Sequence, residues 1–269
     1  MSVHASNLDA ARPTSAGAGP HYLICGASGN LGSHTARQLA RPGTSLSLWG
    51  RNGIKLDEIA AECSQAGATV STRSLDLTDV AVALAALREE DDQNAFDGAF
   101  FLSGSGDTRE ADRAIESAGQ IVQLAMLNYV APAALAAELG ERMAARRRGR
   151  IAIVGTAAAT HPLPFAAGYA SSKSGLAQFA EALRIALSPF SVTVTLVSPG
   201  FFAAPTAGAH GYSRPGEISA ALVAQRMIAS VRSGKRELVT PKVFLLLRWI
   251  GHALPRPVRD FVMLRLSSP

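Results

Sequence analysis

The sequence predicts an α/β fold in which one parallel sheet is doubly wound, with helices on both faces. Short apolar runs alternate along the chain with longer stretches of helical periodicity, which is the order expected of such a sheet. A glycine-rich turn directly follows the first apolar run, at the first strand-to-helix connection. The 269 residues, 48% of them hydrophobic and 17% charged, suffice for one well-buried core. We therefore expect one domain.

Six apolar runs have the length and composition of buried strands. They are Tyr22–Cys25, Ser45–Trp49, Thr69–Leu75, Gly98–Leu102, Ile151–Val154 and Val192–Val197. Helical patterns lie between them, beginning with Asn30–Ala40. Two long connections, 155–168 and 200–216, are rich in Gly, Pro and Ala, and long loops after strand ends are where substrates bind. We expect His161–Ala167 and Phe201–Arg214 to face the substrate.

The two ends of the chain differ from its middle. Residues 1–19 are rich in Ala, Ser, Gly and Pro and contain no apolar run of the signal-peptide kind, so they predict a flexible tail. The domain should cover 20–269, with 240–269 as a basic, apolar C-terminal extension. Its apolar residues at helical spacing favour packing on the core or on a second copy of the chain; they are Val243, Leu246, Leu247 and Ile250.

The same extension also has the composition of a segment that lies on a membrane surface. Its basic residues outnumber the single acid Asp260, and aromatic side chains provide apolar anchors. The basic residues are Lys242, Arg248, Arg256, Arg259 and Arg265, and the anchors are Phe244, Trp249 and Phe261. The apolar stretch 243–250 is far shorter than the ~20 residues of a spanning helix. Packing on the protein and membrane contact are compatible, and both stay open.

Cysteine and histidine usage gives no sign of a metal site. Cys25 and Cys63 lack metal-ligand spacing and indicate a reducing, cytoplasmic location rather than a disulfide framework. His161 and His210 lie on separate loops with no third ligand beside them, so we expect no bound metal.

A net charge of +5 is concentrated in one cluster just before the fifth strand. The cluster consists of Arg146, Arg147, Arg148 and Arg150. No aromatic platform or recognition motif accompanies it, which favours a solvated helix end over nucleic-acid binding.

The glycine-rich turn predicts a dinucleotide site. Glycines allow a sharp turn and a close approach of the backbone to a pyrophosphate, and the free N–H groups of the following helix favour its charge. A glycine triplet between a strand and a helix is typical of the first connection of a Rossmann domain. We expect the cofactor to contact Gly26, Ser28, Gly29, Asn30, Leu31 and Gly32.

The end of the second strand distinguishes the two nicotinamide dinucleotides. An NAD enzyme would place a carboxylate there against the ribose diol, but this chain has Arg51. A planar guanidinium suits a 2′-phosphate, so we expect NADP(H) in preference to NAD(H); a solvent-facing loop arginine is the alternative. After the third strand, Asp76 and its neighbour Leu77 should contact the adenine, unless Asp76 caps the next helix.

Tyr169 and Lys173 are four residues apart in a helical stretch and so share one helix face. Because a nearby ammonium favours phenolate, we expect Lys173, with an oxidised nicotinamide, to lower the pKa of Tyr169 from about 10 toward the working pH. Tyr169 would then serve as a general acid or base. Such a pair is by itself usually a solvated surface feature. Its place between the glycine turn and Pro199–Gly200 favours a hydride-transfer site.

In order and spacing, several of these motifs together resemble the short-chain dehydrogenase/reductase family, and the resemblance extends over nearly everything from Tyr22 onward. They are the three glycines, Asp76, Asn128, the Tyr169–Lys173 pair and Pro199–Gly200. The resemblance implies an NAD(P)-dependent oxidoreductase that interconverts alcohols and carbonyl compounds, with Pro199 and Gly200 contacting the cofactor. It also implies pairing of copies through the central helices. The small residues of Ala131–Ala137 suit such a homo-oligomer, or equally a helix buried within one chain.

The resemblance implies four catalytic residues. Tyr169 protonates the carbonyl oxygen, and Thr156 stands where the family has a serine that binds that oxygen. Lys173 holds the ribose and tunes Tyr169, and Asn128 positions a water-linked proton relay to the lysine. The segment Leu102–Gly106 departs from the family's Asn-Asn-Ala-Gly, so its packing should differ.

Three functions remain open from the sequence. The C-terminal extension, with Gly234–Val239 and Asn128–Tyr129, is similar to family members that reduce a decaprenylphosphoryl-linked 2-keto-sugar. This implies a ketoreductase acting on a polyprenyl-phosphate-linked keto-sugar, with peripheral contact through 240–266 at the inner face of the membrane. The alternative is a soluble ketoreductase for an acyl, polyketide or other small carbonyl compound. The altered Leu102–Gly106 segment leaves a third reading, a dinucleotide-binding protein without turnover.

Overall fold

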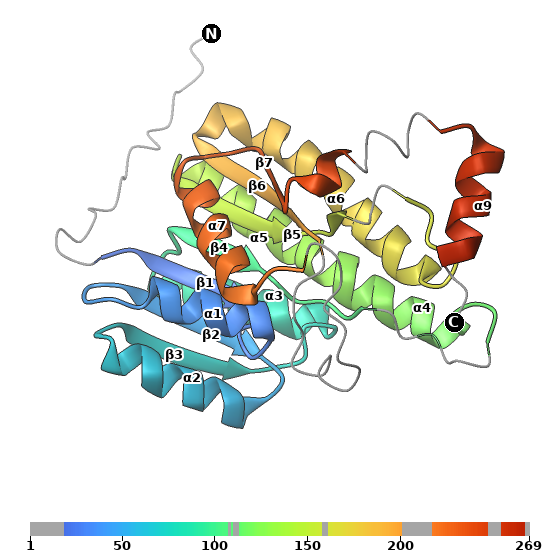
Figure 1. Ribbon diagram of the computed structural model, residues 1–269. Helices are drawn as coiled ribbons and strands as arrows, with labels where there is room; N and C mark the ends of the chain where they lie inside the picture. The colour runs from blue at the N-terminus through green and yellow to red at the C-terminus, as the bar shows by residue number, and fades with distance from the viewer. Residues whose placement is uncertain are drawn as a thin grey trace, which may run out of the picture.

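Seven strands form one parallel sheet in the order β3-β2-β1-β4-β5-β6-β7 in the computed structural model of the chain (Figure 1). The strands are β1 His21–Cys25, β2 Ser45–Gly50, β3 Thr69–Ser74, β4 Gly98–Phe101, β5 Gly149–Val154, β6 Val192–Pro199 and β7 Glu237–Thr240. The structure describes residues 19–106, 109, 113–157, 161–200, 217–246 and 254–266. The doubly wound fold predicted from the alternating pattern is confirmed.

Helices cover both faces of the sheet, as Figure 1 shows. One face carries α1 Asn30–Leu39, α2 Gly53–Gln65 and α7 Ala220–Arg232, and the other carries α3 Val80–Gln93, α5 Ala131–Ala145 and α6 Ala167–Leu187. Side chains alternate across β1, so Leu23 and Cys25 enter one core while Ile24 enters the other. The buried thiols of Cys25 and Cys63 are free.

A long helical run precedes β5 on the second face. It consists of α4 Ala118–Ala125, a π-helical turn over Met126–Val130, and α5. By length and composition this run could cross a membrane, but the inner side of α5 belongs to the core beneath the sheet. The small residues Ala131, Ala133 and Ala136 are buried there. Part of Ala131–Ala137 therefore packs within the chain's own core, while Ala137 is exposed.

The sequence pattern missed the seventh strand. β7 has only four residues, begins with a charged one, and is merely half-buried along most of its length, so it lacks the apolar run of a buried strand. It pairs with β6 in register Leu196 to Glu237. The remaining strands agree with the predicted runs to within two residues at either end.

The C-terminal extension packs on the sheet through a different residue from those expected. Val243 and Leu246 are exposed, whereas the ring of Phe244 lies against the backbone of Gly200 at the end of β6. Phe244 therefore does not serve as an exposed membrane anchor. Leu247, Arg248, Trp249 and Ile250 lie outside the described residues, as do 1–18 of the predicted tail.

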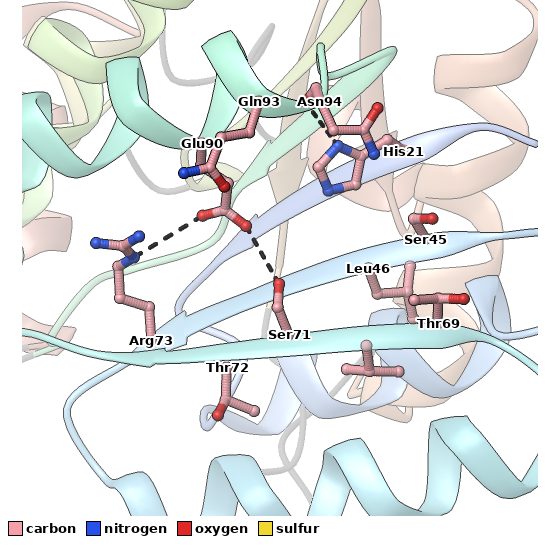
Figure 2. Close-up of a pocket in the computed structure, with 11 residues that line it drawn as sticks. His21, Ser45, Leu46, Thr69, Ser71, Thr72, Arg73, Glu90, Gln93 and Asn94 are labelled. Carbon is pink, nitrogen blue, oxygen red and sulfur yellow. Dashed lines mark hydrogen bonds and ion pairs between the residues drawn. The ribbon is translucent and has the colours of Figure 1, made fainter. Parts of the chain in front are cut away.

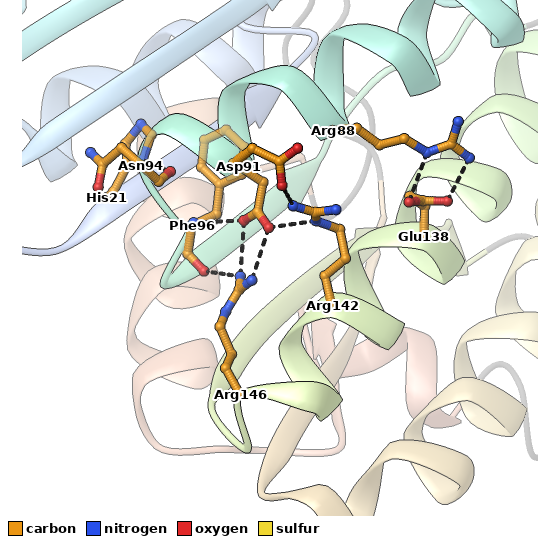
Figure 3. A network of polar contacts seen from close by, with 9 residues as sticks. His21, Arg88, Asp91, Asn94, Phe96, Glu138, Arg142 and Arg146 are labelled. Carbon is orange, nitrogen blue, oxygen red and sulfur yellow. Dashed lines mark hydrogen bonds and ion pairs between the residues drawn. The ribbon is translucent and has the colours of Figure 1, made fainter. Parts of the chain in front are cut away.

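In the arginine cluster before β5, Arg147, Arg148 and Arg150 are exposed, as predicted for a solvated helix end, but Arg146 is not, because it binds a buried carboxylate. Arg146 donates to both carboxylate oxygens of Asp91 at 2.9 and 3.0 Å and to the carbonyl of Phe96 at 2.7 Å (Figure 3). Arg142 donates to the same carboxylate at 2.6 Å. Burial alone would raise the pKa of Asp91, but these hydrogen bonds outweigh it and hold the pKa below its usual range. Arg142 and Arg146 thus link α5 to α3.

Asp91→Asn should destabilise the fold by about 3 kcal/mol at pH 7, because two guanidinium groups then lose a carboxylate that is only 1% exposed. Since the folded pKa is lowered, the stabilisation is present above the unfolded pKa of about 4 and is lost as pH falls through the folded value. Urea unfolding at pH 7 and at pH 3 to 4 measures the free energy of unfolding of the native chain and of the variant. The difference between the two should be smaller at the acidic pH. Asp92→Asn is the matched control. Because Asp92 is exposed, this substitution should lower the free energy of unfolding by less than about 1 kcal/mol. Equal losses in the two variants would contradict the assignment.

Candidate active site

Lys173 lies buried at the carboxyl edge of the sheet, with 4% of its surface exposed. Its Nζ donates to the carbonyl of Val154, at the end of β5, at 3.0 Å, and lies 3.5 Å from the carbonyl of Ser103, just after β4. Both of these partners are uncharged carbonyl groups. Burial therefore lowers the pKa of Lys173 to about 8, so an appreciable fraction is neutral just above physiological pH.

Asn128 is fully buried in the π-helical turn between α4 and α5. Its Oδ1 accepts from the N–H of Ser105 at 2.8 Å, and its Nδ2 donates to the carbonyl of Ser105 at 3.0 Å and to Oγ of Ser172 at 3.3 Å. Ser172 in turn donates to the carbonyl of Tyr169 at 2.8 Å. π-Helical turns recur at functional sites. Here the side chain of Asn128, carried by such a turn, connects the loop after β4 to α6.

Gly104 explains how the loop after β4 packs without the family's asparagines. A Cβ at this position would lie 3.0 Å from Nζ of Lys173 and 3.1 Å from Oδ1 of Asn128. Only a residue without a side chain leaves both groups undisturbed. The expected difference in packing thus takes the form of direct contacts between the loop backbone and two predicted catalytic residues.

Tyr169 and Thr156 form a hydroxyl pair at the same edge. Tyr169 is in the first turn of α6, Thr156 follows β5, and their side chains are hydrogen-bonded. The expected lowering of the Tyr169 pKa is wrong for the chain itself. Burial raises this pKa, and the hydrogen bond from Thr156 offsets only part of the increase. The ammonium of Lys173 is directed to the carbonyls of Val154 and Ser103 instead.

The glycine turn has the geometry that a pyrophosphate requires. Gly26 has φ +87°, in the region that favours glycine, and its N–H donates to the carbonyl of Trp49 at 2.8 Å. A Cβ on Gly32 would lie 2.1 Å from the carbonyl oxygen of Gly26, so helix and turn are in direct backbone contact. The N-cap residue of α1 is Gly29, which has no side chain to occupy the helix N-terminus. These features fit a dinucleotide phosphate.

Ser28 lies in this turn, and Asn30 and Leu31 begin the helix that follows it. Ser28 lies beside the end of β2, because a Cβ on Gly50 would be 2.7 Å from its Oγ. Asn30 is the first residue of α1, and Leu31 is buried beneath it. The turn therefore faces the residue that follows β2, which is Arg51.

Arg51 is exposed beyond the end of β2, close enough to Asp76 to act on its charge. Hydrogen bonds from the backbone N–H and hydroxyl of Thr78, aided by Arg51, lower the pKa of Asp76. Asp76 does not cap α3, because Asp79 does so by accepting from the N–H of Val82. The alternative of a capping Asp76 is thus wrong, and its exposed carboxylate stays beside the cofactor edge, next to buried Leu77.

Pro199 and Gly200 lie where β6 ends. The N–H of Gly200 donates to the carbonyl of Thr240 at 2.9 Å, and a Cβ on Gly200 would be 2.0 Å from the ring of Phe244. The C-terminal extension therefore begins against the site. The expected substrate-facing segment Phe201–Arg214, with His210, lies outside the described residues. His161–Ala167 leads into α6, as expected for a segment beside the site.

A separate hollow of about 310 Å³ lies at the opposite, amino-terminal end of the strands. Figure 2 shows that several of its polar groups are paired with one another. Glu90 accepts from Ser71 at 3.2 Å and faces Arg73 at 3.9 Å, while Nδ1 of His21 is 2.9 Å from the carbonyl of Asn94. The hollow is therefore apart from the predicted chemistry, and we assign it no ligand.

Comparison with known proteins agrees with this geometry. The family model for short chain dehydrogenases matches residues 20–213. The chain belongs to the short chain dehydrogenase family. As a member of this family it is an NAD(P)-dependent oxidoreductase, which favours an enzyme over the dinucleotide-binding protein without turnover.

Two relatives and one solved structure illustrate the family's range. An uncharacterized oxidoreductase of Myxococcus xanthus is 28% identical over 246 residues, 91% of this chain and 96% of the relative. A very-long-chain 3-oxoacyl-CoA reductase of Aspergillus terreus is 28% identical over 187 residues, 66% of this chain but only 52% of that enzyme. The structure of a Sphingobium yanoikuyae short-chain dehydrogenase in complex with NADPH shares the fold, with TM-score 0.75, 24% identity and coverage of 91% and 95%.

The structure adds groups that sequence reasoning missed. The carbonyl of Ser103, the backbone of Ser105 and the hydroxyl of Ser172 hold the predicted catalytic residues. The only signal in the sequence was the unusual composition of Leu102–Gly106, which predicted that this loop packs differently from that of the family. For Glu116, which contacts the start of α6, no local pattern gave a signal.

Proposed function

We propose that this short-chain dehydrogenase is an NADP(H)-dependent ketoreductase. The observation that carries the proposal is the Tyr169–Thr156 hydroxyl pair, one helical turn from buried Lys173, at the same sheet edge as the glycine turn. Asn128 binds the loop after β4, through the N–H of Ser105. A carbonyl oxygen that approaches the two hydroxyls would meet two donors at once, which is the arrangement that stabilises developing charge on oxygen.

The protein's own groups suit protonation of that oxygen. When bound, the dinucleotide supplies the hydride to the carbonyl carbon. Tyr169 donates its proton to the carbonyl oxygen, and its raised pKa keeps the phenol protonated at neutral pH. Thr156 donates a second hydrogen bond. Lys173 is still largely charged at pH 7 and can help to return a proton to Tyr169 along the path beside Asn128.

Arg51 supports NADP(H) over NAD(H). It is the first residue after β2, its guanidinium is exposed, and it forms no salt bridge with any residue that the structure describes. Asp76, whose charge Arg51 acts on, follows β3 and accepts hydrogen bonds from Thr78. A 2′-phosphate beside Arg51 would gain a charge-assisted, bidentate contact.

Arg51→Gln should weaken NADPH binding about 10- to 100-fold and change NADH binding less than threefold, because only NADPH carries the charge that the guanidinium would meet. Fluorescence titration with both dinucleotides measures the two affinities. Arg41→Gln is the control, because Arg41 is an exposed arginine that follows α1 at the opposite end of the strands. Equal affinities of the native chain for NADPH and NADH would overturn the preference.

Tyr169→Phe should lower turnover by at least about 100-fold and leave NADPH affinity within threefold, because it removes the proton donor and little else. A panel of keto-sugars, 3-oxoacyl thioesters and other carbonyl compounds should be followed by NADPH oxidation. Tyr22→Phe is the matched control, since Tyr22 packs beside Phe100 inside the sheet. If no compound on the panel gives turnover that Tyr169→Phe abolishes, the ketoreductase proposal fails.

For the substrate, a keto-sugar on a polyprenyl phosphate is supported by the surface of α9, Arg256–Leu266. Val258, Phe261, Val262 and Leu264 are exposed on this helix, with the guanidinium of Arg265 over the Phe261 ring at 5.3 Å. Apolar side chains interspersed with arginines suit an anionic bilayer. A small acyl compound is the second candidate, supported by the 3-oxoacyl-CoA reductase relative.

The double substitution Phe261→Ser and Leu264→Ser should weaken sedimentation with phosphatidylglycerol vesicles at least fivefold, because it removes two exposed apolar anchors. Binding to phosphatidylcholine vesicles should be weak throughout, since the arginines then have no anionic partner. Ile54→Ser on α2 removes an apolar residue that is even more exposed but lies elsewhere, and it serves as the control. Failure of the native chain to sediment with anionic vesicles would favour the small acyl substrate.

A further inference from the structure

Glu116 is a buried carboxylate outside the four predicted catalytic residues, with 2% of its surface exposed. Its Oε2 accepts from the N–H of Ala167 at 3.2 Å and its Oε1 from the N–H of Gly168 at 3.0 Å. These are the first two residues of α6, and the next residue is Tyr169. Glu116 thus binds the backbone immediately before the proton donor.

Helix α6 depends on this distant residue because its own N-cap supplies no acceptor. The first four N–H groups of a helix have no partner within the helix and need one from elsewhere. The N-cap residue of α6 is Ala166, which has no side-chain acceptor. The carboxylate of Glu116 meets two of these N–H groups, and a negative charge is favourable at this end of a helix.

Glu116 is itself held in place by the start of α4. The next residue, Ser117, is the N-cap of α4 and forms a reciprocal capping box with Gln120, at 3.3 and 2.7 Å. Around Gly168 the two helices are closely packed, because a Cβ there would lie 3.2 Å from Leu124 and 3.4 Å from Oε1 of Glu116. The start of α6 therefore packs against the capped N-terminus of α4.

We propose that Glu116 is a positioning residue for the reaction, which rests on the proposed ketoreductase function. By holding the first turn of α6, it sets the position of the Tyr169 hydroxyl against Thr156. Loss of this cap lets the first turn fray and displaces the hydroxyl, and a displacement of about 1 Å can cost on the order of 100-fold in rate. Cofactor binding through the glycine turn is unaffected.

The test compares Glu116→Ala, Glu116→Gln and Ile115→Ala in the full chain. Glu116→Gln keeps one acceptor oxygen, while Ile115→Ala is the matched control, because Ile115 is the exposed neighbour of Glu116 in the same segment. Three quantities are measured: hydrogen exchange in the peptide that covers 166–172, NADPH affinity, and kcat and KM for whichever carbonyl compound the native chain reduces.

Glu116→Ala should speed exchange at 167–169, lower kcat about 10- to 100-fold and leave NADPH affinity within threefold, with partial recovery in Glu116→Gln. Ile115→Ala should leave kcat within twofold and exchange at 167–169 unchanged. Unchanged exchange or unchanged kcat in Glu116→Ala, or equal losses in Ile115→Ala, would overturn the proposal. If Glu116→Ala does not fold, the same comparison is made with Glu116→Gln. A native chain without turnover would instead contradict the ketoreductase function, and the exchange result would still decide whether Glu116 caps α6.

Discussion

The site depends on a buried ammonium held by neutral partners. Lys173 is almost fully buried, and the carbonyls of Val154 and Ser103 are its hydrogen-bond partners. Burying a cation in this way is costly, since carbonyl dipoles compensate less than a carboxylate would. The two carbonyls come from the ends of β5 and β4, which are neighbours in the sheet. Strand order and register therefore determine where this cation can lie.

The segments around Lys173 are arranged to meet this constraint. The loop after β4 can approach the lysine because residue 104 is glycine. The loop is kept there by two hydrogen bonds between Ser105 and Asn128, one accepted and one donated by the Asn128 amide, and the π-helical turn at Met126–Val130 carries that side chain. Since Asn128 also contacts Ser172 on α6, the loop, the turn and the catalytic helix form one connected unit. A change in any one of them would move the others.

Local sequence patterns predicted the parts of the fold and site that depend on neighbours in the chain. Strand periodicity, the glycine turn and the Tyr169–Lys173 spacing are of this kind. Contacts between distant segments were not predictable, because no local signal specifies a partner fifty residues away. Arg146 with Asp91 and Glu116 with Gly168 are two such pairs. The Tyr169 pKa was misjudged for a related reason: spacing showed a nearby charge but not how deeply the phenol is buried.

The two shifted pKa values affect which of the two groups carries a proton near neutral pH. Burial disfavours charge on both groups, so it raises the pKa of Tyr169 and lowers that of Lys173. At neutral pH the phenol keeps its proton while the lysine is close to releasing one, and both states favour delivery of protons to an incoming oxygen. Burial therefore keeps Tyr169, in the chain without a dinucleotide, in the protonated form that can donate to a carbonyl oxygen.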